Sequence, residues 1–210
     1  MEHPKLFKSH LLYPEDRRIK VEGPIPAQAL ADLSMHPHLD AFRRPADQHE
    51  ALIEIAGLPE GRIIAAIDND TIVGYVTFHY PDELERWSQG NMEDLIELGA
   101  IEVADDYRSL GLGQHLIKTA FEDGQLEAYI VFTTEYYWHW DLQGSGLNVW
   151  DYRNMMERLM KVVDMEWYAT DDPEICSHPA NCLMVRIGSK VPLSSKEQFD
   201  RIRFQQRIMY

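Results

Sequence analysis

The stretch Glu102–Ile117, EVADDYRSLGLGQHLI, decides how the rest of the sequence is interpreted. It begins at the end of an apolar run, residues 95–103, that predicts a strand, and it ends in apolar residues whose helical spacing predicts an amphipathic helix. Gly111 and Gly113 lie where the strand gives way to the helix. Glycine permits positive φ and lets a ligand approach the backbone closely. The turn is therefore either a glycine-rich helix entry or a loop that holds a ligand.

A helix start favours an anion, because its first backbone N–H groups have no partners and its dipole is positive there. Two common phosphate-binding motifs nevertheless do not fit. A P-loop would continue with Lys and then Ser or Thr, whereas Gly113 is followed by Gln114 and His115. A dinucleotide fingerprint would have Gly or Ala at Leu116 and would lie earlier in the chain.

The sequence around this turn predicts an α/β sandwich around a mixed sheet. Residues 61–80 are typical of a β-hairpin, with two apolar runs on either side of an Asp-Asn-Asp turn. The other strands are expected at residues 95–103, 128–134 and 166–170, and the helices at 26–35, 46–56, 113–123, 147–163, around 177–187 and at 196–207.

Composition limits the classes of function. The chain has 210 residues and a formal net charge of −15, which argues against nucleic acid or an anionic membrane as the main partner. No apolar run reaches the roughly 18 residues that a membrane span needs, and the N-terminus lacks an apolar signal core. With Cys176 and Cys182 as the only cysteines, a reducing cytoplasm is expected. His36, His38 and His49 lack spaced ligand partners, so no metal site is expected.

A third phosphate-binding pattern does fit. Residues 108–113, RSLGLG, match R/Q-x-x-G-x-G/A, which resembles the acetyl-CoA signature of the GCN5-related N-acetyltransferase (GNAT) superfamily. The resemblance implies an α/β (α+β) fold with a central mixed, mostly antiparallel sheet flanked by helices. The sequence has no repeat, low-complexity tract or obvious linker, so one domain is expected over residues 1–210, with an N-terminal extension to about residue 45 and a C-terminal tail from about residue 190.

The resemblance also implies where acetyl-CoA, the expected co-substrate, would bind. The backbone N–H groups of Arg108 to Gln114 would meet the pyrophosphate of coenzyme A, and the strand end at Ile101 to Val103 would pair with the pantetheine amides. The residues expected to contact coenzyme A are Ile101, Val103, Arg108, Ser109, Leu110, Gly111, Leu112, Gly113 and Gln114.

Acetyl transfer to an amine needs a base, because a lysine with an ordinary pKa near 10.4 is protonated at pH 7. Glu97 is ranked first: counted back from Arg108, it falls at or one residue from the glutamate that protein-lysine acetyltransferases of this family use. Glu102 is ranked second, and strand alternation places it on the opposite face unless a bulge intervenes. Asp171 and Asp172 are further candidates, although Asp172-Pro173 is also typical of a turn.

A second family pattern, N-x-x-A-x-x-L-Y-x-x-x-G, finds its nearest match on the helix expected around residues 177–187. Ser177, Ala180, Leu183, Met184 and Gly188 have the right spacing. Ser replaces the family's Asn, and Met184 replaces the tyrosine general acid. A thiolate leaving group with a pKa of about 8.5 makes that loss tolerable.

The resemblance extends over nearly the whole chain to a branch of the family whose members acetylate a lysine of acetyl-CoA synthetase and so switch it off. It is carried by residues 89–104, 133–142 and 169–188. It implies a protein-lysine acetyltransferase with that synthetase as its partner. The alternatives are an N-acetyltransferase for small amines and a regulatory protein that senses acetyl-CoA with little turnover. The oligomeric state stays open.

Two further segments have two interpretations each. The aromatic segment 136–142, YYWHWDL, is either packing beneath the sheet or a wall where a lysine-bearing partner docks. The acidic segments 82–87 and 91–94 either solvate the surface or also steer a basic partner toward the site.

Overall fold

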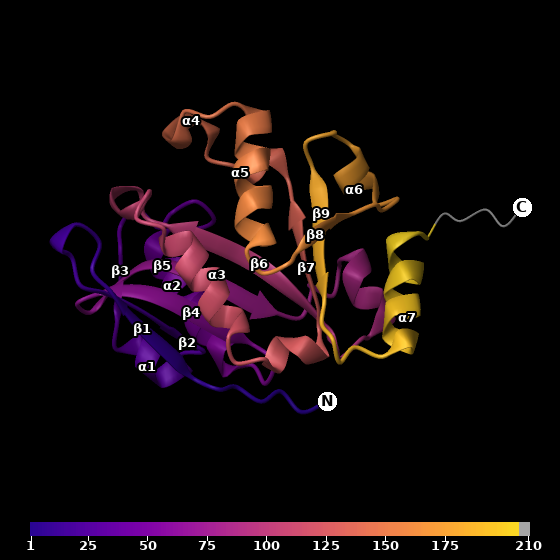
Figure 1. The fold of residues 1–210 in the computed structure, drawn as a ribbon, viewed down its shortest axis with the longest axis horizontal. Coiled ribbons are helices and arrows are strands. Elements are labelled where there is room, and N and C mark those ends of the chain that lie inside the picture. The colour runs from indigo at the N-terminus through magenta and orange to yellow at the C-terminus, as the bar shows by residue number, and fades with distance from the viewer. Residues whose placement is uncertain (206–210) are drawn as a thin grey trace, which may run out of the picture. The chain divides into compact units, whose positions relative to one another are not determined.

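The structure is a computed structural model that describes residues 1–205 (Figure 1). The chain divides into two compact units. The first, here called the hairpin unit, comprises residues 2–79 and 98–125. The second, here called the C-terminal unit, comprises Met1, residues 80–97 and the chain from Leu126 onward. Strand β6 (Leu95–Val103) contributes residues to both units.

The strands of the hairpin unit follow the order β1-β2-β4-β5-β6. The expected hairpin is present, because β4 pairs antiparallel with β5, and Asn69 in the turn between them has a φ of 54°. The strand bounds are β1 (Lys8–Leu12), β2 (Ile19–Gly23), β4 (Arg62–Asp68) and β5 (Thr71–His79), and the short β3 (Ser34–Met35) pairs parallel with β5.

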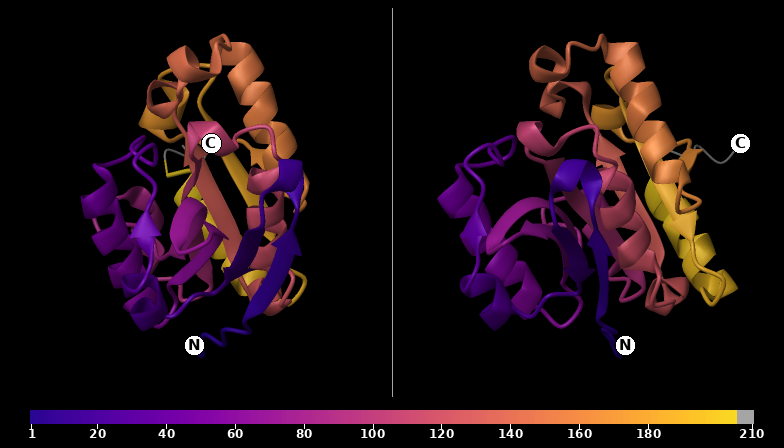
Figure 2. Two further views of the ribbon diagram at one scale, coloured as in Figure 1. Left: turned by 90° about the vertical axis from the view of Figure 1, so that its left-hand side faces the viewer. Right: turned by 60° about the vertical axis from the view of Figure 1, so that its left-hand side comes forward.

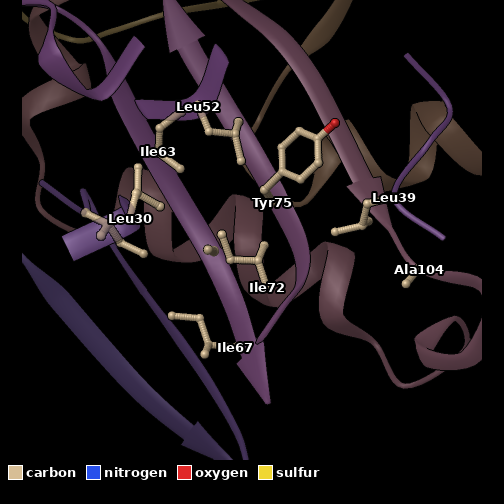
Figure 3. Packing of buried hydrophobic residues seen from close by; sticks show 10 residues of the cluster. Leu30, Leu39, Leu52, Ile63, Ile67, Ile72, Tyr75 and Ala104 are labelled. Carbon is tan, nitrogen blue, oxygen red and sulfur yellow. The ribbon is translucent and has the colours of Figure 1, made fainter. Parts of the chain in front are cut away.

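Helices cover both faces of these strands. Figure 2 shows α1 (Ala27–Ala31) and α2 (Pro45–Gly57) on one face of β2, β4 and β5, and α3 (Leu112–Phe121) on the other. The first face holds a hydrophobic cluster, part of which is drawn in Figure 3. Its buried members are Ile25, Leu30, Leu39, Leu52, Ile63, Ala65, Ile67, Ile72, Tyr75 and Ala104. The hydroxyl of Tyr75 points away from the aliphatic side chains.

The strands of the C-terminal unit follow the order β6-β7-β9-β8. Leu95–Glu97 of β6 pair parallel with β7 (Ile130–Glu135), and β9 (Cys182–Ile187) lies antiparallel between β7 and β8 (Glu166–Tyr168). Its helices are α4 (Leu142–Ser145), α5 (Val149–Lys161), α6 (Pro173–Cys176) and α7 (Leu193–Arg203). Buried residues from η2 (Arg86–Gly90), the strands and α7 form its core.

The expected fold class is confirmed: the nine strands form a mixed, mostly antiparallel sheet flanked by helices. The prediction of a helix around residues 177–187 is wrong, because Cys182–Ile187 form β9. The run CLMVRI fits between two neighbouring strands with its first four residues buried, and a short continuous apolar run is typical of a strand buried on both faces. The expected single domain with its boundaries near residues 45 and 190 stays a prediction.

The two ends of the chain differ from expectation in other ways. The hairpin of β1 and β2 was not expected, and only part of the helix at 26–35 forms, because β3 follows it. The C-terminal helix ends at Arg203, and residues 206–207 of the expected helix lie outside the described residues. Among residues 1–205, no helix has the length and apolar character that crossing a membrane requires.

Residues 4–6 of the hairpin unit form hydrogen bonds with a buried ion pair. Arg62 and Asp123 form an ion pair of 3.2 Å whose side chains are 1% and 2% exposed. Arg62 also donates to the carbonyl of Pro4 at 2.6 Å, and the backbone N–H of Leu6 donates to Asp123 at 3.3 Å. These bonds hold residues 4–6 next to the end of α3, since Asp123 lies just beyond Phe121.

Candidate active site

The connection between β6 and α3 has a defined backbone conformation. The backbone N–H of Ala104 donates to the carbonyl of Val73 at 2.9 Å, which holds the end of β6 against β5. A short turn, η3 (Asp105–Tyr107), follows. The Nε of Arg108 then donates back to the carbonyl of Val103 at 3.3 Å. Arg108 therefore closes the loop onto the strand from which it starts.

Two residues of this loop have left-handed conformations. Ser109 has a φ of 67°, and Gly111, the N-cap of α3, has a φ of 76°. For residues other than glycine this region of φ costs about 1–2 kcal/mol, so Gly111 suits the turn. A Cβ built on Gly111 would meet no heavy atom within 4 Å. The space beside the start of the helix is therefore open.

The first turn of α3 is available to an anion. Within residues 1–205, no side chain caps this helix at Gly111. The first backbone N–H groups of any helix lack partners inside it, and the dipole is positive at that end. Leu112 is buried and fixes the helix start, whereas Gly111 and Gln114 are exposed. An exposed helix start of this kind is a common anion-binding site in proteins. Coenzyme binding by Arg108 to Gln114 and by Ile101 to Val103 stays a prediction.

The two glutamates of β6 lie in different surroundings. Glu102 is buried, and both of its carboxylate oxygens accept hydrogen bonds: from the Tyr75 hydroxyl at 2.6 Å and from the backbone N–H of Ala41 at 2.9 Å. Burial raises the pKa of Glu102, while the bonds from Tyr75 and Ala41 oppose that rise. This bonding favours a role in holding the segment around Ala41 in place. Glu102 as a base stays a prediction.

Glu97, in the C-terminal unit, is only 9% exposed, yet its carboxylate has no hydrogen-bond partner within the described part of the chain. Burial raises the pKa of Glu97 to about 8, and the nearby carboxylates of Glu85 and Asp82 act in the same direction. A carboxylate with a pKa near 8 is a stronger base than an ordinary one and is still partly ionised near neutrality. These are the properties expected of a group that accepts a proton from an amine.

Asp171 and Asp172, the further candidate bases, take part in ion pairs and in a helix cap. Arg86 pairs with Asp171 at 2.7 Å and with Asp172 at 3.3 Å. Asp172 also caps α6, where it accepts from the backbone N–H groups of Glu174 and Ile175. Met184, at the position of the family's tyrosine, lies on β9 and is buried, so the comparison with the family's helix pattern does not hold at this position.

Sequence reasoning missed a further buried glutamate. Glu135, at the end of β7, is 9% exposed and accepts a hydrogen bond from the indole Nε1 of Trp140 at 3.0 Å. Burial raises the pKa of Glu135 to about 7, although the bond from Trp140 opposes the rise. Only its position as the last polar residue of an apolar run, directly before the aromatic segment, could have singled it out. Among residues 1–205, no group of three or more His, Cys, Asp or Glu side chains is placed to hold a metal ion.

Comparison with known proteins identifies the family of the chain. The model of the acetyltransferase (GNAT) family matches residues 27–138, which include β6, the loop and α3. The chain therefore belongs to the GNAT acetyltransferase family and is an N-acetyltransferase. The family uses acetyl-CoA.

Particular relatives match over the whole chain. The acetoin utilization protein AcuA of Bacillus subtilis (strain 168) is 58% identical over 210 residues, and that of Bacillus licheniformis is 57% identical, with all of each protein covered in both cases. A crystal structure of an acetoin utilization protein from Exiguobacterium sibiricum superposes with a TM-score of 0.96 at 51% identity, covering 99% of this chain and 98% of that one.

Proposed function

We propose that this enzyme transfers the acetyl group of acetyl-CoA to the side-chain amine of a lysine in a protein, and that the protein is an acetyl-CoA synthetase. The observation that carries the chemistry is Glu97, a buried carboxylate that has no hydrogen-bond partner among residues 1–205 and whose pKa is raised to about 8. The full-length similarity to proteins named for acetoin utilization supports a substrate in that metabolism.

The coenzyme would be held at the start of α3. The residues proposed for its pyrophosphate are those from Arg108 to Gln114, which combine the open space at Gly111 with an uncapped helix start. Ile101 to Val103, at the end of β6, would offer backbone groups to the pantetheine amides. Acetyl-CoA supplies the thioester, whose carbonyl carbon is the electrophile.

The role proposed for Glu97 is to make the amine nucleophilic. A lysine ammonium has an ordinary pKa near 10.4, so its deprotonation at pH 7 costs roughly 4–5 kcal/mol. Glu97 accepts that proton, directly or through one water. The freed nitrogen lone pair forms a bond to the thioester carbonyl carbon, the carbon–sulfur bond breaks, and the sulfur leaves with the electron pair as a thiolate. The thiolate needs little assistance from an acid, because its pKa is about 8.5.

The test is incubation of an acetyl-CoA synthetase with acetyl-CoA and the enzyme, followed by peptide mass spectrometry. We expect an acetyl group on a lysine of the synthetase and a loss of its activity. Glu97→Gln should slow the transfer by about a hundredfold or more, whereas Glu166→Gln, which removes an exposed carboxyl on β8, should not. Acetylation of small amines but of no protein lysine would overturn the proposed substrate. An unchanged rate for Glu97→Gln would overturn the assignment of Glu97 as the base.

A further inference from the structure

The C-terminal unit carries a continuous row of aromatic rings on its surface. Tyr136 and Trp138 stack with ring centroids 4.8 Å apart, and Trp138 meets Tyr137 edge-on at 5.4 Å. Tyr137 lies 4.2 Å from His178, and His178 lies 6.4 Å from Trp150 in a stacked orientation. This aromatic row joins the end of β7 to the start of α5 by way of the segment between α6 and β9.

The aromatic row is only partly core packing: Tyr136 packs against the core of the C-terminal unit, whereas the two tryptophans are exposed. Trp138 is 47% exposed and Trp150 is 51% exposed. It is nevertheless held in place from below, because the backbone N–H of Tyr137 donates to the side chain of Asn181 at 3.0 Å, and Asn148 caps the helix on which Trp150 lies. Large exposed aromatic rings on a fixed support are typical of protein contact surfaces.

One end of the aromatic row lies among carboxylates. The hydroxyl of Tyr136 donates to Glu174 at 3.4 Å, and Asp172 and Glu85 are close enough to raise the pKa of Tyr136 along with burial. Glu85 also faces Glu97. A row of carboxyl groups therefore extends from Tyr136 to Glu97. Asp172 is paired with Arg86 at 3.3 Å, and Glu97 is the one buried member of this group without a hydrogen-bond partner within the described residues.

We propose that the aromatic row is the docking surface for a basic segment of a protein, the segment that carries the acceptor lysine. This inference rests on the proposed function. Arginine and lysine side chains bind the faces of Trp and Tyr through cation–π contacts and lay their methylene stems against the rings. The carboxylates at the Tyr136 end then favour the approach of the acceptor ammonium toward Glu97, because opposite charges attract most strongly where water is partly excluded.

The test uses the full-length enzyme, saturating acetyl-CoA and three synthetic peptides. Each peptide has one central lysine as the acceptor, flanked on both sides by arginines, by serines or by glutamates. We expect the lowest KM for the arginine peptide, with an advantage that shrinks as salt is added. Trp138→Ala and Trp150→Ala should each raise that KM by about threefold to fivefold, while kcat and the KM for acetyl-CoA stay the same. Trp138→Phe should retain most of the affinity.

Trp167→Ala is the matched control, because Trp167 is 55% exposed on β8 of the same unit and takes no part in the aromatic row. If lysines are acetylated but the arginine peptide has no advantage, or the two tryptophan variants behave like Trp167→Ala, the docking surface is refuted and the proposed function stands. If no lysine of any peptide or protein is acetylated, the proposed function itself fails. Conversion of a dimer to a monomer by Trp138→Ala would instead identify the row as an interface between copies and would also refute the inference.

Discussion

Replacing Glu97 with Gln should change how the stability of the protein depends on pH. The folded-state pKa of this carboxyl is about 8, against 4.5 for an ordinary glutamate, mainly because burial disfavours the charged form. Between these two values the unfolded chain has lost the proton while the folded chain keeps it. The free energy of unfolding therefore falls as the pH rises from about 4.5 to about 8. Gln cannot ionise, so the variant lacks this decline.

The size of the effect follows from the two pKa values. The free energy of unfolding of Glu97→Gln minus that of the wild type should grow by about 4–5 kcal/mol between pH 4 and pH 8.5, with most of the change between pH 5 and pH 8. Urea unfolding followed by circular dichroism at several pH values measures it directly. Glu166→Gln, which removes an exposed carboxyl of the same unit, serves as the control.

Parallel pH profiles for the wild type and Glu97→Gln would refute the reasoning, because they would mean that Glu97 ionises at an ordinary pH in the folded protein. The proposed role in catalysis would then lose its physical basis. The same titration has a kinetic counterpart: kcat/KM for a lysine peptide should rise with pH up to about 8, as the basic form of Glu97 becomes populated.

Three other substitutions test the hairpin unit. Gly111→Asp should weaken acetyl-CoA binding, measured by calorimetry, by at least about a hundredfold, whereas Gly146→Asp, at a glycine with a similar φ of 66° and equally open space, should not. Glu102→Ala should lower the free energy of unfolding by about 2 kcal/mol, because it leaves a buried hydroxyl and a backbone N–H without their acceptor; an unchanged urea midpoint would contradict this. Arg62→Met should cost about 3–5 kcal/mol by leaving Asp123 buried without its charged partner. Adding Asp123→Leu should recover part of that loss in thermal unfolding, because it removes the unpaired charge but also the acceptor of the backbone N–H groups of Leu6 and Gln125.

Sequence patterns predicted the helices and strands best where apolar residues mark the one buried face of an element. Residues 95–103 were expected as a strand and form β6 with the same bounds. The helix after the glycines forms as α3, because its apolar residues recur at helical spacing on one buried face. The position of the loop between them was predictable, because the two glycines lie between a clear strand pattern and a clear helix pattern.

Other elements depend on tertiary context that no local pattern carries. The run CLMVRI was expected to be part of a helix around residues 177–187, yet β7 and β8 on either side make it a strand. In β1 every second residue is exposed, and its pairing with β2 could not be read from so short a polar segment. The differences between the carboxyl groups of Glu97, Glu102 and Glu135 depend on which donors lie near each oxygen. The donors to Glu102, Tyr75 and Ala41, come from distant parts of the chain, whereas the donor to Glu135 is Trp140, five residues further on.

The two ends of α3 are held very differently, and this has a consequence for amide hydrogen exchange. Beyond its last residue, Asp123 accepts from Arg62 and from the backbone N–H of Leu6, and His10 of β1 lies 2.5 Å from Glu122. Among the described residues, none caps its first turn with a side chain, and none lies within 4 Å of a Cβ built on Gly111. The last turn should therefore exchange slowly with or without a ligand. An anion at Gly111 would slow exchange in the first turn alone, so this short segment would report occupancy of the loop without any measurement of acetyl transfer.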